Sequence, residues 1–99
     1  MPQLLIQNPN PGTPLQLSAT AKNFRHATVI ACKSLAGPSV AANTGMVKMG
    51  LSANPSEQPL EFNPGDERNF TAAAGQMLDL SQYYLSVANA NDGVVVLFQ

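Results

Sequence analysis

The stretch that decides the fold begins with Gly45-Met46-Val47-Lys48-Met49-Gly50-Leu51 and runs through residues 43–99. Three further β-type segments follow, which are Pro59-Leu60-Glu61-Phe62, Tyr83-Tyr84-Leu85-Ser86-Val87 and Val94-Val95-Val96-Leu97-Phe98. Strong turn signals separate them, chiefly Asn63-Pro64-Gly65-Asp66 and Asn91-Asp92-Gly93. This pattern predicts a mostly β protein, a small antiparallel β-sandwich or barrel of jelly-roll-like type with at most one short helix.

Two of these turns carry specific expectations. Pro64 is preset for the first central position of a tight turn and Gly65 supplies positive φ at the second, so residues 67–71 should return as a strand. Asp92 and Gly93 tolerate the positive φ of a hairpin turn.

That hairpin would pair residues 83–88 with residues 94–98. The second of these segments is an unbroken apolar run, which predicts a buried central strand.

The longest strand candidate covers residues 24–35. Phe24, His26, Thr28 and Cys32 would share one face, and because neither face is purely polar the strand should be central in its sheet. His26 is interpreted as a hydrogen-bonded structural histidine and Cys32 as a buried apolar residue. The two side chains would lie about 20 Å apart on a regular strand, which excludes a Cys–His dyad unless the strand breaks between them.

Residues 71–90 combine helical spacing with strand-like alternation. We expect a loop, then one helical turn near residues 79–82 with Asp79 as its cap, then a strand from residue 83 to 88. A full helix over this segment is the alternative.

Residues 1–22 are interpreted as an N-terminal arm, followed by a single β-domain over residues 23–99. The arm opens with a short apolar run and continues with three prolines within residues 9–14, which cannot donate to a sheet ladder. It would either pack along the edge of the domain or reach a neighbouring copy. We expect Leu4, Leu5 and Ile6 to be intermolecular assembly contacts, and residues 15–18 to resume as an edge strand.

Composition narrows the function classes. Apolar residues make up 44% of the chain, whereas charged residues make up only 11%, which argues against disorder and predicts a neutral surface compatible with self-assembly. The net charge is −1 and the five basic residues are scattered, so no nucleic-acid partner is expected. The sequence has no signal-peptide pattern and no apolar run of about 18 residues, so no membrane partner is expected either.

No constellation of catalytic or metal-binding residues accompanies the β pattern. The chain has one histidine, one cysteine and six dispersed acidic residues, and it lacks the glycine-rich phosphate and nucleophile motifs. We therefore expect no enzyme, no cofactor and no metal.

The spacing of several phrases resembles a known group. Arg25-His26-Ala27-Thr28-Val29-Ile30-Ala31, Asn43-Thr44-Gly45, Asn63-Pro64-Gly65-Asp66-Glu67 and Asn91-Asp92-Gly93-Val94 resemble, in order, small β-sandwich proteins from tailed-bacteriophage structural gene clusters. The resemblance covers roughly residues 24–98, departs at the Ala-rich residues 71–76, and transfers no catalytic residue. It implies a head-decoration, head-fibre or tail-associated component of the virion, commonly a homo-oligomer.

Three functions follow as hypotheses. The first is a virion structural protein that forms a trimer or dimer, contacts other virion proteins and is made in the host cytoplasm. The second is a carbohydrate- or receptor-binding β-module, and the third is a small enzyme of cupin type.

Overall fold

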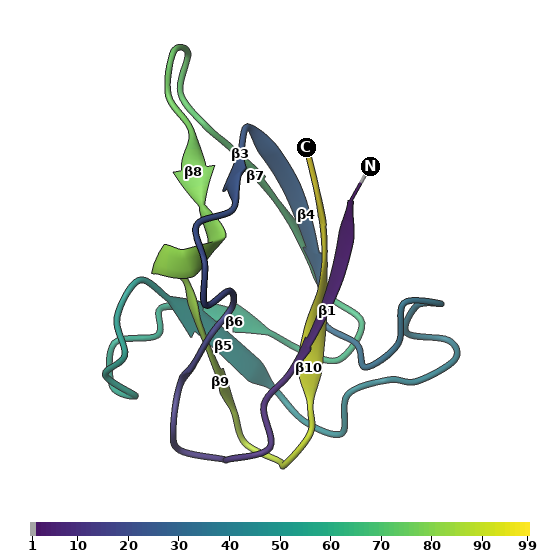
Figure 1. The fold of residues 1–99 in the computed structure, drawn as a ribbon. Coiled ribbons are helices and arrows are strands. Elements are labelled where there is room, and N and C mark those ends of the chain that lie inside the picture. Colours follow the sequence, from purple (N-terminus) through teal and green to yellow (C-terminus); the bar gives the residue numbers. More distant parts are fainter. Residues whose placement is uncertain (1) are drawn as a thin grey trace.

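The protein folds as two antiparallel β-sheets packed face to face, in a computed structural model that describes residues 2–99 (Figure 1). Sheet A has the strand order β1–β10–β4–β7, sheet B has the order β2–β9–β5–β6, and β3 pairs with β8. The bounds are β1 Gln3–Gln7, β2 Leu15–Gln16, β3 Asn23–Phe24, β4 His26–Ile30, β5 Val47–Gly50, β6 Leu60–Phe62, β7 Glu67–Thr71, β8 Leu78–Asp79, the 3-10 helix η1 Leu80–Gln82, β9 Tyr84–Val87 and β10 Gly93–Phe98. The predicted small antiparallel β-sandwich with one short helical turn is confirmed.

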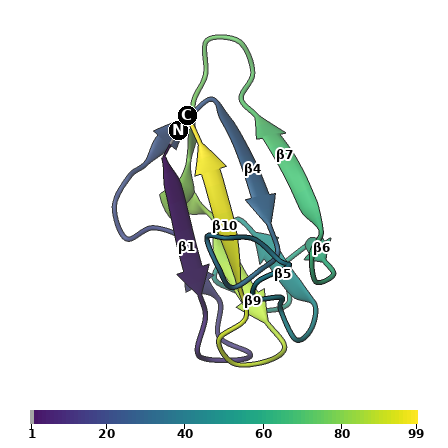
Figure 2. The same cartoon turned by 90° about the vertical axis from the view of Figure 1, so that its right-hand side faces the viewer.

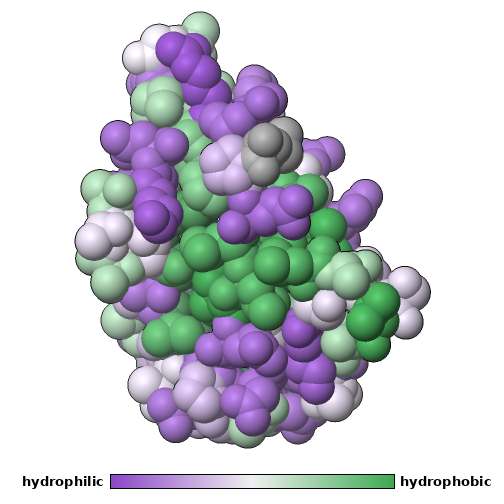
Figure 3. All heavy atoms as spheres, turned by 45° about the vertical axis from the view of Figure 1, so that its right-hand side comes forward, coloured by the Kyte–Doolittle hydropathy of each residue, from purple (hydrophilic) through white to green (hydrophobic). Residues whose placement is uncertain are grey.

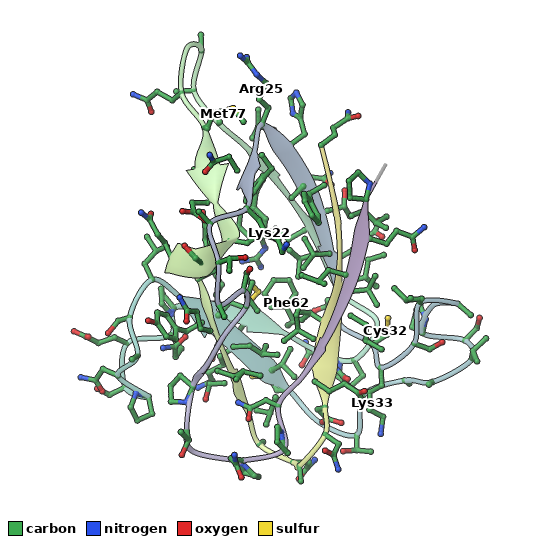
Figure 4. All side chains as sticks on the ribbon, viewed as in Figure 1. Lys22, Arg25, Cys32, Lys33, Phe62 and Met77 are labelled. Carbon is green, nitrogen blue, oxygen red and sulfur yellow. The ribbon has the colours of Figure 1, made fainter. Side chains whose placement is uncertain are left out.

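The core lies between the two sheets and is built by period-two alternation. Val94 and Val96 of β10 face Val47 and Met49 of β5 across this space, and all four are almost completely buried. Phe62 of β6 projects into the same space (Figure 4). This interleaving of the inner faces of sheets A and B makes one continuous core.

The long strand expected over residues 24–35 is interrupted. The main-chain N–H groups of Arg25 and His26 both donate to the carbonyl of Gln99, at 2.8 and 3.2 Å, which is the pattern of a β-bulge. The extra residue shifts the alternation, so Phe24 is buried in the core whereas His26 is exposed. The prediction that these two residues share a face is therefore wrong, but β4 is central in sheet A as expected.

The segment before β9 follows the expected course. Asp79 caps η1 by accepting a hydrogen bond from the Ser81 N–H, and β9 begins at Tyr84. The loop, helical turn and strand are confirmed, and the full helix is excluded. The short pairing of β8 with β3 was not anticipated.

The N-terminal segment is part of the sandwich. β1 pairs with β10 from Gln3↔Leu97 to Gln7↔Gly93, and Ile6 is buried in the core. The expectation of an arm outside the β-domain is wrong, because β1 pairs with β10 along its whole length; intermolecular contact through Leu4, Leu5 and Ile6 stays a prediction. The proline-rich link then carries the chain to sheet B, where β2 is an edge strand as predicted.

The two predicted hairpins are crossings between sheets. β9 pairs with β2 and β5 in sheet B, while β10 pairs with β1 and β4 in sheet A, so the prediction that they pair with each other is wrong. β6 and β7 are likewise in different sheets. The turn signals were correct as turns, but a turn signal does not encode which sheet the chain enters next.

Candidate functional site

The first candidate surface is the side of sheet A that faces away from sheet B, here called the outer face. The register places Leu5, Val95 and Ile30 side by side in one row across it, with Leu97 in the neighbouring row. Leu5, Ile30 and Leu97 are half-exposed. Figure 3 shows hydrophobic atoms gathered on this side of the molecule. An apolar surface of this kind is typical of a site that contacts another protein.

Part of the outer face is already covered by the chain itself. Val95 is only 2% exposed although it lies outside the main core cluster. In Figure 2 the loop between β4 and β5 passes over the lower half of β10. Beyond the end of β4, the Asn43 amide continues the ladder by accepting from the Gly93 N–H at 3.0 Å and donating to its carbonyl at 2.8 Å.

The second candidate is a cleft of about 710 Å³ at the side of the sandwich where residues 51–59 join β5 to β6. This volume is within the range of small-molecule sites, about 300–1,000 Å³. Its lining is Gly50, Leu51, Ser52, Ser56, Glu57, Gln58, Pro59, Leu60, Phe70 and Tyr83.

Gln58 is the one polar side chain in the cleft wall that is nearly fully buried. Its Nε2 donates to the carbonyls of Ser52 and Asn54, at 2.6 and 3.0 Å, and so holds the loop closed. Its Oε1 has no hydrogen-bond partner. A buried acceptor without a donor is costly; this oxygen is closed off from solvent beside Gly50, so it belongs to the loop packing and not to the open surface of the cleft.

Tyr83 forms the aromatic side of the cleft. Its ring centroid lies 6.0 Å from that of Phe70 and 6.5 Å from that of Phe24. Burial raises the pKa of the Tyr83 hydroxyl above its ordinary value, which keeps the group protonated and able to donate a hydrogen bond. Sequence reasoning missed the cleft, since Gln58, Phe70 and Tyr83 come from three distant segments without a shared motif.

Asp92 has a different role from the turn residue that the sequence predicted. Its carboxylate is completely buried and accepts hydrogen bonds from the N–H groups of Thr44 and Gly45, both at 3.0 Å, and from the Thr44 hydroxyl at 3.1 Å. Lys33 Nζ lies 3.8 Å from Asp92 Oδ1. Asn91, with φ 69°, takes the positive φ that was expected at Asp92 and Gly93.

This network joins the loop after β4 to the crossing between β9 and β10; Figure 4 shows Lys33 on that loop. Because each donor to Asp92 comes from a chain segment remote in sequence, the network fixes the position of the β4–β5 loop. Its groups are all mutually satisfied, so we interpret it as structural.

The remaining residues with chemical potential do not converge. His26 is exposed, with Nδ1 3.4 Å from the Thr71 hydroxyl, and the buried Cys32 donates from Sγ to the Ser34 carbonyl. Among residues 2–99, no three His, Cys, Asp or Glu side chains lie close enough to hold a metal ion together. In the same part of the chain, no helix has the length and apolarity needed to cross a membrane.

Pro64 and Gly65 form the predicted tight turn, which is exposed. The Asp66 N–H donates to the Asn63 carbonyl at 3.0 Å, and Gly65 has φ 87°. The predicted site residues therefore separate into three places: this turn, the buried network around Asp92, and the β1 strand that borders the outer face. Comparison of the chain with protein-family models, curated proteins and solved structures gives no match.

Proposed function

We propose that this chain is a non-enzymatic structural module that associates with further copies of itself and docks on a larger particle. The observation that carries the proposal is the apolar outer face, where Leu5, Ile30 and Leu97 stay half-exposed around the buried Val95. Covering such a surface is favourable because it removes apolar area from water. The low charge of the chain supports association, since copies repel each other only weakly.

Sedimentation velocity over a rising protein concentration tests the self-association. The expected result is a mass that increases from monomer to dimer or trimer. Leu97→Gln on the outer face should weaken association. Met77→Gln is the control and should not, because Met77 is an exposed apolar residue outside both candidate surfaces. A strict monomer at every concentration contradicts the proposal.

The larger particle in this proposal is the virion of a bacteriophage or prophage. This part rests on the resemblance of residues 24–98 to small phage β-sandwich proteins. The genes that flank this one provide the test: portal, capsid or tail genes support a virion component, and metabolic genes contradict it.

The cleft favours a second candidate function, carbohydrate binding. A sugar ring would present an apolar face to Tyr83 and hydroxyl donors to the exposed carboxylate of Glu57. A glycan array tests this, with Tyr83→Leu expected to lose any signal and Tyr84→Leu expected to keep it. No signal above background with the unchanged protein removes this candidate.

A further inference from the structure

β1 has one free edge with unpaired main-chain groups. The Asn8 N–H donates to the Asp92 carbonyl and the Phe98 N–H donates to the Pro2 carbonyl, so the even-numbered residues of this segment face β10. In an antiparallel ladder the main-chain N–H and C=O groups of successive residues point alternately to one side of the strand and to the other. The main-chain groups of Gln3, Leu5 and Gln7 therefore point away from the sheet.

This edge lacks the features with which proteins usually prevent strand pairing, namely charges, prolines within the strand and short length. The opposite edge of sheet A, β7, carries Glu67 and Arg68. In sheet B, β2 has two residues, and β6 has three with Glu61 in the middle. Among the strands that the structure describes at residues 2–99, β1 is thus the longest edge strand without a charge.

The sequence of β1 is also self-complementary. It reads Gln-Leu-Leu-Ile-Gln, with amide side chains at both ends and apolar side chains between them. Antiparallel pairing of two copies around a twofold axis at Leu5 places Gln3 opposite Gln7, Leu4 opposite Ile6, and Leu5 opposite its own counterpart. In such a pair, residues whose main-chain groups point to the free edge must lie opposite residues of the same kind in the second copy. Several registers satisfy this condition, but only this one pairs all five residues of β1.

We propose that two copies of this chain join through β1 in this register, and that sheet A thereby continues into the second copy as one eight-stranded sheet. This inference rests on the proposed self-association and gives it a second contact besides the outer face, the edge of β1, which holds together the two copies of a dimer. The outer-face row Ile30–Val95–Leu5, in which Leu5 and Ile30 are partly exposed, then runs on into the same row of the second copy. Both outer faces lie on one side of the dimer, where they form a doubled apolar surface for docking.

Sedimentation velocity of edge variants tests the pairing. Leu5→Pro removes an N–H that has no partner within the monomer, so it should abolish the dimer and leave the fold intact, which circular dichroism checks. Asn69→Pro is the matched control, because its N–H faces outward from the middle of β7; it should leave the dimer unchanged. Leu5→Lys tests the edge independently if the proline variant unfolds, since it sets two like charges opposite each other.

Oxidative cross-linking tests the register. In hydrogen-bonded antiparallel pairs the Cα atoms lie about 5.5 Å apart, within disulfide range, so Leu5→Cys should form a covalent dimer. Gln3→Cys should not, because its counterpart lies four residues away along the strand. The unchanged protein controls for Cys32, which is buried.

The outcomes separate the two proposals. If the unchanged protein is a monomer, self-association fails. If it is a dimer that Leu5→Pro and Leu5→Lys leave intact, or if Gln3→Cys cross-links while Leu5→Cys does not, the β1 pairing or its register is wrong and self-association through another surface stands.

Discussion

The two crossings between the sheets look alike in sequence but differ in the structure. The crossing from β6 to β7 uses an exposed turn in which the Asp66 carboxylate accepts from the Asn63 N–H of the same turn. The crossing from β9 to β10 buries Asp92, which binds Thr44, Gly45 and Lys33 instead. One aspartate shapes its own turn, whereas the other anchors a distant loop, so their contributions to stability should differ greatly.

Replacing the two aspartates gives the largest expected difference. Asp92→Ala leaves buried N–H donors without an acceptor and Lys33 without its partner, so the free energy of unfolding should fall by about 3 kcal/mol or more. Asp66→Ala should cost below about 1 kcal/mol, because water replaces the lost hydrogen bond in an exposed turn. Urea denaturation of both variants measures the difference. Equal losses of unfolding free energy would contradict the different roles of the two aspartates.

The glycines of the two crossings give the second difference. A Cβ atom at Gly93 would meet the Ile6 carbonyl oxygen of β1. Gly93→Ala should therefore force β1 away from β10 and lower the free energy of unfolding by about 2 kcal/mol. Thermal unfolding should show this loss, and hydrogen exchange should show that the amides of β1 exchange faster. Unchanged exchange in β1 would contradict the displacement of β1 from β10.

Gly65→Ala is the matched change in the exposed turn. Nothing lies within 4 Å of the added Cβ, so only the strain of a positive φ remains. We expect a loss of about 1 kcal/mol, without any change in the exchange of β1 amides. A loss larger than that of Gly93→Ala would show that backbone strain outweighs the close approach of β1 and β10.

The smallest effect concerns Asp79, a local cap like Asp66. Hydrogen bonds from the Ser81 N–H and the Lys22 N–H hold the pKa of Asp79 below its ordinary value of 3.8. Its contribution to stability is therefore complete above this pH and is lost as the pH falls through the lower folded-state pKa. Asp79→Asn should make the melting temperature decline less steeply below about pH 4, and an unchanged slope would contradict this role.

The sequence was informative where the cause is local. The strand around Val47 and Met49, the Pro64-Gly65 turn and the helical turn capped by Asp79 each depend on neighbouring residues, and all were predicted. Pairing depends on distant segments, so the predicted partner of β10 was wrong. The bulge at Arg25 and His26 was missed for the same reason, since it requires the carbonyl of Gln99.

The candidate sites follow the same division. Leu4, Leu5 and Ile6 form a short apolar run that is visible in the sequence, but whether that run enters a sheet depends on β10. The cleft around Gln58 and Tyr83 exists only after residues 51–59 fold back on Gly50, where a Cβ atom would lie 2.5 Å from the Glu57 carbonyl oxygen. No local sequence signal encodes that approach.

The central claim is that β1 belongs to sheet A and offers its free edge to a second copy. Residue-resolved amide hydrogen exchange at low and high protein concentration tests both halves at once. At low concentration Leu4 and Ile6 should exchange slowly and Leu5 quickly, and at high concentration Leu5 should become slow as well. Fast exchange at all three residues would show that β1 does not pair with β10, and a Leu5 amide that stays fast at high concentration would show that its edge remains free.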